Sequence, residues 1–135
     1  MRKTLIIAVV ALVCACAAPP SGEPIAQGSE RKSKIGYASV AAALHSVQMQ
    51  QGMKIGRQDG WIIASDNKEH VIWSFTPDAH PAHPSAVKRR VFEKNGEVYI
   101  DMQVLCEANA ASCDRLIDQF DELNDRMREQ LRSGA

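Results

Sequence analysis

Two histidines, His80 and His83, stand three residues apart in the proline-rich stretch 77–84, and a proline follows each of them. Imidazole nitrogens bind Zn or Cu, and His70, Asp78 or Glu69 would supply a third or fourth ligand. The two imidazoles converge only if the loop folds back on itself, and histidines also cap strands or bond backbone carbonyls. The sequence therefore leaves open a metal site at His80 and His83 and a structural or partner-binding role.

The same stretch contains the residue types of a hydrolase triad in Ser85, His83 and Asp78. A triad needs a scaffold that orients the base between nucleophile and carboxylate, and close neighbours in sequence rarely achieve this. The chain has neither a glycine-rich nucleophile elbow nor a phosphate-binding loop, and Cys106 and Cys113 lack the C-x-x-C spacing of thiol oxidoreductases. We therefore expect no enzymatic activity and no cofactor.

The first residues predict export. Arg2 and Lys3 precede the apolar run 5–13, which is too short to span a bilayer and has the length of the core of a secretory signal. The next residues, "VCAC" (13–16), resemble the lipobox of bacterial lipoproteins, in which an aliphatic residue stands three before the modified cysteine and a small residue just before it. The match falls on Cys16, although valine replaces the common leucine of the motif and a cysteine fills its second position.

This resemblance implies that residues 1–15 are removed and that Cys16 carries a diacylglycerol thioether, with acyl chains such as palmitate on the lipid anchor. Because Ala17 rather than aspartate follows the cysteine, the resemblance also implies an outer-membrane protein that faces the periplasm. Ordinary signal cleavage after Ala17 is the alternative, and it would release a soluble periplasmic protein.

The two remaining cysteines, Cys106 and Cys113, form an even pair in an oxidising compartment and are close enough in sequence to be joined. A disulfide between them would fix the corner between the last predicted strand and the last predicted helix. Two buried free thiols are the alternative.

Composition divides the chain into a tether and one domain. Residues 16–34 are rich in proline, serine, glycine and charge and read as a flexible linker, and residues 35–135 form a single predicted domain. Without residues 1–15 the chain keeps 14 basic and 16 acidic residues, a formal charge of −2. Nothing in this balance favours a nucleic-acid partner.

Hydrophobic periodicity predicts an α+β domain. Residues 39–51 have helical spacing, with Ser39 as a plausible N-cap and Gly52 as a plausible stop. Residues 112–131 carry a single apolar stripe and predict a C-terminal helix that lies on a sheet. Between them the sequence predicts an antiparallel meander of four or five strands, which includes residues 53–57, 61–65 and 70–76.

The dipeptide Asn95-Gly96 predicts a type I′ hairpin, because both central residues of that turn need positive φ. The resulting register leaves Val87, Val91 and further apolar residues on a core face, with Arg89 and Glu93 towards its rims. On the opposite face it pairs Lys88, Arg90, Phe92 and Lys94 with Gln103, Asp101, Tyr99 and Glu97.

The proline-rich loop between strands is the best candidate for a binding site, because prolines restrict its conformations and binding residues concentrate on such loops. We expect Trp73, Phe75, His80 and His83 to contact a partner, although the aromatic rings would equally fill the core. The predicted function is a non-enzymatic, lipid-anchored envelope module that binds a protein or peptidoglycan partner, in plan similar to small uncharacterised bacterial lipoproteins. A periplasmic metal-binding protein that uses His80 and His83 is the alternative.

Overall fold

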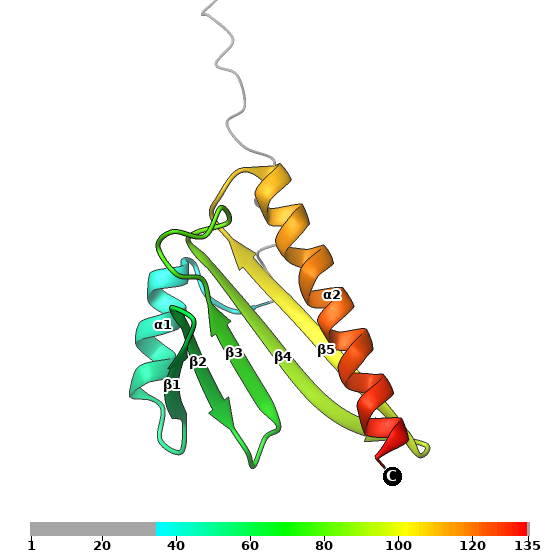
Figure 1. Ribbon diagram of the computed structural model, residues 1–135. Coiled ribbons are helices and arrows are strands. Elements are labelled where there is room, and N and C mark those ends of the chain that lie inside the picture. The colour runs from blue at the N-terminus through cyan, green and yellow to red at the C-terminus, as the bar shows by residue number, and fades with distance from the viewer. Residues whose placement is uncertain (1–34, 135) are drawn as a thin grey trace, which may run out of the picture.

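The computed structural model describes residues 35–134, so the predicted signal peptide, the predicted lipid anchor Cys16 and the linker lie outside the described residues (Figure 1). The described chain contains two helices and five strands: α1 (Val40–Met49), β1 (Lys54–Gln58), β2 (Trp61–Asp66), β3 (Val71–Phe75), β4 (Ser85–Lys94), β5 (Glu97–Cys106) and α2 (Ala110–Ser133). All strands pair antiparallel in one sheet of order β1-β2-β3-β4-β5. The predicted α+β meander is confirmed.

Tight turns set the register of the sheet. Asp59 and Gly60 join β1 to β2 with φ of 50° and 83°, and Asn95 and Gly96 join β4 to β5 with φ of 55° and 77°. Positive φ at both central residues matches the right-handed twist of the flanking strands. The predicted β4–β5 register is confirmed, since Lys88, Arg90, Phe92 and Lys94 stand opposite Gln103, Asp101, Tyr99 and Glu97.

Helix α1 begins at the predicted cap, because the Ser39 hydroxyl accepts a hydrogen bond from the Ala42 amide at 3.1 Å. It ends at Met49, before the predicted stop at Gly52, whose φ of 84° belongs to the turn into β1. Its buried residues are Val40, Ala43 and Val47, which pack on the face of the sheet that carries Trp73 and Phe75.

Helix α2 is longer than predicted at both ends. Its N-cap is Asn109, whose side chain accepts from the Ser112 amide at 2.9 Å, so the expected start at Ser112 lies inside the first turn. Its apolar residues Leu116 and Phe120 pack with Val87 and with side chains of β5 on the other face of the sheet. Among the described residues, neither helix is long and apolar enough to cross a membrane.

The two helices lie on opposite faces and are offset sideways (Figure 1). Helix α1 lies behind the sheet on the side of β1, and α2 lies in front along β5. Strands β2, β4 and β5 therefore contribute alternating residues to two separate cores, whereas all residues of β1 are exposed. Because α2 follows β5, neither helix of the described residues 35–134 lies over the front of β1, β2 and β3.

One sequence prediction is wrong at this level. Arg89 was expected at the rim of its face, but it is 7% exposed and lies between the sheet and α2. Alternation along β4 assigns the residue to the correct face, but the depth at which it sits depends on where α2 crosses the sheet.

Candidate functional site

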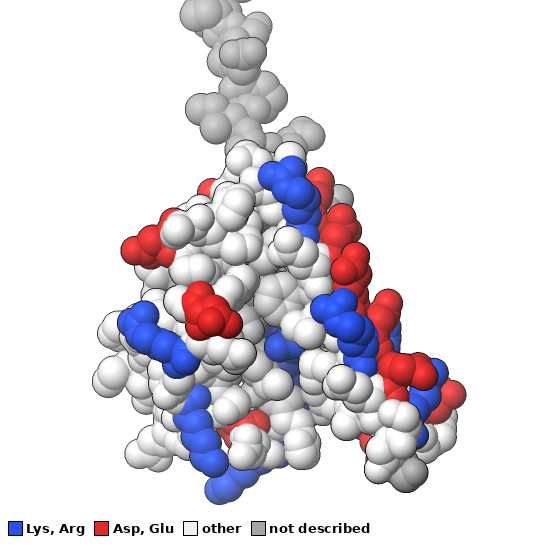
Figure 2. Space-filling view, viewed as in Figure 1, with Lys and Arg blue, Asp and Glu red and all other residues white. Residues whose placement is uncertain are grey.

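A groove runs between α2 and the part of the sheet that α2 leaves uncovered. Its volume is about 550 Å³, within the range of roughly 300–1,000 Å³ that is typical of ligand pockets. Figure 2 views this face and shows charged side chains along α2, with a largely uncharged surface next to the helix. We call this feature the α2 groove, and its apolar lining consists of Trp61, Ile63, Ile72, Phe120 and Leu123.

Polar side chains line the rest of the α2 groove. Gln58 and Asp59 come from the end of β1 and its turn, Gln119 and Arg126 come from α2, and Arg89 comes from the middle of β4. Arg126 approaches Glu122 at 3.8 Å in an exposed i,i+4 pair on the helix. Ser74 of β3 also lines the groove, and Arg89 and Ser74 are the two buried residues of this polar lining.

Asp59 is the acidic member of the groove lining, but none of the ion pairs among residues 35–134 involves Arg89. Its Nη1 donates to Asn124 Oδ1 at 3.4 Å and approaches Met127 Sδ at 3.4 Å, and its Cζ lies 5.1 Å from the centre of the Phe120 ring. Its Nε is buried and has no acceptor within the described part of the chain. Burial alone lowers the pKa of the Arg89 guanidinium, with no compensating acidic neighbour.

The proline-rich loop lies next to the α2 groove, where His80 contacts Trp61 of the lining. Thr76 and Ser85 form its neck, since the Thr76 amide donates to the Ser85 carbonyl at 3.1 Å and the Ser85 amide donates to Thr76 Oγ1 at 2.9 Å. Two further turns follow, in which the amides of His80 and His83 donate to Pro77 and His80 carbonyls, each at 2.9 Å. The expected ordered loop is therefore held by its own backbone hydrogen bonds.

His80 lies where the loop meets the groove. Its ring contacts the edge of Trp61, with 5.1 Å between ring centres, and its Nδ1 accepts from the Ala82 amide at 3.0 Å. Burial, followed by the nearby His83, lowers the pKa of His80. Trp61 is half-buried, so the His80–Trp61 pair forms an aromatic wall at the end of the groove.

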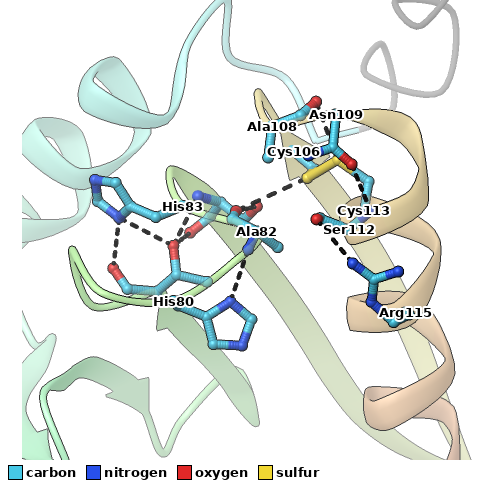
Figure 3. Close-up of a disulfide and its surroundings, with 11 residues drawn as sticks. His80, Ala82, His83, Cys106, Ala108, Asn109, Ser112, Cys113 and Arg115 are labelled. Carbon is cyan, nitrogen blue, oxygen red and sulfur yellow. Dashed lines mark hydrogen bonds between the residues drawn. A yellow bond between two sulfur atoms is a disulfide. The ribbon is translucent and has the colours of Figure 1, made fainter.

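His83 turns away from His80, as Figure 3 shows. Its Nδ1 lies 3.1 Å from the Thr76 carbonyl oxygen, and its Nε2 lies 3.6 Å from Asp78 Oδ1. Glu69 and His70 precede β3 and thus lie at the other end of that strand from the loop. Within residues 35–134, no three histidine, cysteine or acidic side chains are grouped so that they could hold a metal ion.

Ser85 and His83, two of the three residues considered for a hydrolase triad, are not arranged as nucleophile and base. Ser85 is fully buried, and its hydroxyl donates to the Ala82 carbonyl oxygen. The ring of His83 is used at the neck of the loop, next to Thr76.

The prediction that Trp73 and Phe75 contact a partner is wrong, because both side chains are buried. Trp73 and Phe75 are 3% and 2% exposed and stack with 5.9 Å between ring centres in the core under α1. The alternative reading of these rings, that they fill the core, is the correct one. Trp61, on the opposite face, is the tryptophan that lines a groove.

The corner between β5 and α2 is crosslinked next to the loop (Figure 3). The sulfurs of Cys106 and Cys113 lie 1.99 Å apart, in agreement with the predicted disulfide, and the Cα atoms are 5.9 Å apart. The fully buried Ala82 of the loop packs in the same core as Cys106 and Leu116. The loop, the disulfide and the start of α2 therefore form one packed end of the domain.

A second hollow, of about 460 Å³, lies on the other face, between the turn before α1 and strands β3 and β4. Its charged lining contains Asp66 and Glu69 as well as Lys88 and Arg90, so both signs of charge are present. Lys88 lies over the Trp73 ring, 5.4 Å from its centre. The α2 groove is the better candidate site, because it combines an apolar lining with Arg89, the charged residue of either lining that is buried.

Comparisons with protein-family models, with curated proteins and with solved structures find no match to this chain.

Proposed function

We propose that this protein is a non-enzymatic, lipid-anchored module of the bacterial envelope that binds a partner protein through the α2 groove. The observation that carries the proposal is an open groove with an apolar lining that includes Trp61 and Phe120, beside an ordered loop whose His80 packs against Trp61. Apolar surface that stays accessible beside a rigid loop is characteristic of interaction sites.

The lining favours a protein partner over peptidoglycan. Five apolar side chains from β2, β3 and α2 face the groove, and they would bury the apolar side chains of a peptide segment. A glycan strand would need a denser set of polar groups. The lipid on Cys16 and the linker 16–34 would hold the module at the outer membrane, facing the periplasm, so the partner is expected to be an envelope protein.

A photo-crosslinking residue placed on α2 tests this proposal in cells. Gln119 is exposed and lines the groove, whereas Asp121 is exposed two residues further on, about 200° around the helix. Crosslinking from position 119 is expected to give a discrete adduct that contains an envelope protein, and position 121 is expected not to give it. The same products at both positions, or none at either, would refute groove binding.

No observation favours the metal alternative, because His80 and His83 diverge and both Nδ1 atoms engage the backbone of the loop. Titration with Zn or Cu, followed by the His80→Ala variant, is its test. Stoichiometric micromolar binding that the variant loses would revive it.

A further inference from the structure

The guanidinium of Arg89 is a positive charge placed inside an apolar groove. Arginine side chains are rarely this buried unless an acidic group pairs with them. Here 7% of the residue is exposed, and none of the ion pairs among residues 35–134 involves it. A buried charge is costly unless an opposite charge pairs with it, and the part of the chain described by the structure does not provide an acidic partner for Arg89.

The contacts that Arg89 does make are weak substitutes for a carboxylate. The hydrogen bond to Asn124 Oδ1 is 3.4 Å long, beyond the usual N–H···O range, and the second acceptor, Met127, is a thioether sulfur and a weak acceptor. The contact with the Phe120 ring is a cation–π interaction. Its free energy is smaller than the free energy needed to remove a guanidinium from water. Folding alone therefore does not account for a charge at this position.

We propose that the α2 groove is selective for an acidic peptide segment, in which a carboxylate flanked by apolar side chains binds Arg89. This inference rests on the proposed function and adds the chemistry of the partner. Trp61 and Ile63 on the sheet and Leu123 on α2 would contact the apolar side chains, and the carboxylate would accept hydrogen bonds from the guanidinium at the groove floor. Arg126 at the rim already approaches Glu122 at 3.8 Å, so Arg89 is the cation that would bind the carboxylate.

Charge complementarity selects this occupant over two others. A wholly apolar segment would cover the guanidinium and leave it unpaired, which is the costly outcome for a buried charge. A small inorganic anion would pair the charge but would leave the apolar walls in water. A carboxylate between apolar groups satisfies both parts of the lining.

A matched pair of peptides tests the inference on the full, unsubstituted chain. The protein in detergent is titrated with acetyl-Leu-Glu-Leu-amide and, separately, with acetyl-Leu-Gln-Leu-amide. The readout is the indole N–H resonance of Trp61, with that of Trp73 as internal control, because Trp73 is buried on the opposite face. The glutamate peptide is expected to shift the Trp61 signal and to bind at least about tenfold more tightly than the glutamine peptide.

Two variants assign the selectivity to Arg89. Arg89→Met is expected to bind both peptides equally, and Arg89→Lys is expected to keep part of the preference, because it retains the charge but loses the planar donor geometry. If either variant fails to fold, the peptide pair on the unaltered protein still decides.

Equal binding of the two peptides, or no shift of the Trp61 signal with either, would overturn the inference. Sodium phosphate that shifts Trp61 as strongly as the glutamate peptide would overturn it as well, in favour of a simple anion site. None of these outcomes alters the crosslinking result from position 119. That result tests whether the groove binds a protein at all, independently of whether the bound segment is acidic.

Discussion

At the scale of single residues, Arg89 and Asn124 form the polar pair beneath the α2 groove. If Arg89 serves binding, removing the pair should not weaken the fold. Arg89→Met alone leaves Asn124, which is 4% exposed, without its donor, at a cost of about 1–3 kcal/mol. The double variant Arg89→Met with Asn124→Leu removes both polar groups, and we expect it to be more stable than the parent by about 1–3 kcal/mol.

Urea unfolding at constant m-value measures this difference. Arg90→Met is the matched control, because Arg90 is exposed and points to the other face of β4, and its free energy of unfolding should change by less than about 0.5 kcal/mol. A double variant that is clearly less stable than the parent would show that Arg89 supports the fold, against our interpretation.

His80 is the residue at which pH should act. Burial, followed by the charge of nearby His83, lowers its pKa, and protonation of Nδ1 would also break the hydrogen bond from the Ala82 amide. The unfolded state then takes up the proton more readily than the folded state. The stabilising contribution of neutral His80 is therefore complete above the unfolded pKa of about 6.5 and is lost as the pH falls through the lowered folded pKa.

His80→Asn tests this pH dependence, because an asparagine oxygen accepts from the amide two residues on without titrating. The loss of unfolding free energy between neutral and mildly acidic pH should be smaller in the variant than in the parent. Identical slopes in urea unfolding at a series of pH values would contradict the assignment to His80.

At the scale of elements, the β1–β2 turn and the loop are in contact. Gly60 has φ of 83°, and a Cβ added there would lie 3.1 Å from Pro77 Cβ, whereas Gly52 has φ of 84° and nothing within 4 Å of an added Cβ. In both alanine variants the positive φ should lower the free energy of unfolding by about 1–3 kcal/mol. Gly60→Ala should lose about 1 kcal/mol more, because it also crowds the loop.

Hydrogen exchange of the His80 and His83 amides locates this effect. Their bonds to the carbonyls of Pro77 and His80 define the loop turns. We expect faster exchange of both amides in Gly60→Ala than in Gly52→Ala. Equal exchange in the two variants would mean that the turn and the loop are not coupled.

Local signals in the sequence account for most elements. The Asn95-Gly96 turn demands one backbone geometry, so it predicted both the hairpin and the register of β4 and β5. The start of α2 was misplaced because Asn109 and Ser112 are both good caps, and the Asn109 side chain takes the amide of Ser112.

The α2 groove could not be predicted in the same way. Alternation along β4 separates Arg89 from Lys88 and Arg90 and assigns it to the face under α2. How deep Arg89 lies, and whether Trp61 stays accessible, depend on the sideways offset of α2 along β5, which no local pattern records. The burial of Trp73 and the accessibility of Trp61 follow from this tertiary arrangement.

At the scale of the whole molecule, the proposed lipid anchor would place the α2 groove next to a membrane. The disulfide end of the domain carries the loop, and the groove extends from that loop along α2. With a formal charge of −2 after loss of residues 1–15, the chain has no excess of basic residues to draw it to anionic lipids. The proposed attachment to the membrane is therefore expected to depend on the lipid predicted at Cys16.

Cys14 and Cys16 provide the matched pair that tests this attachment. Cys16→Ala should remove the lipidation site and abolish stable membrane association, whereas Cys14→Ala should leave it intact, because Cys14 belongs to the predicted signal peptide. The readouts are membrane fractionation and intact mass. The parent and Cys14→Ala should both give a mass that begins at Cys16 and includes the lipid, and reduction should add about 2 Da for one disulfide. An unlipidated parent that begins after Ala17 would contradict the anchor and would place the groove on a freely diffusing periplasmic protein.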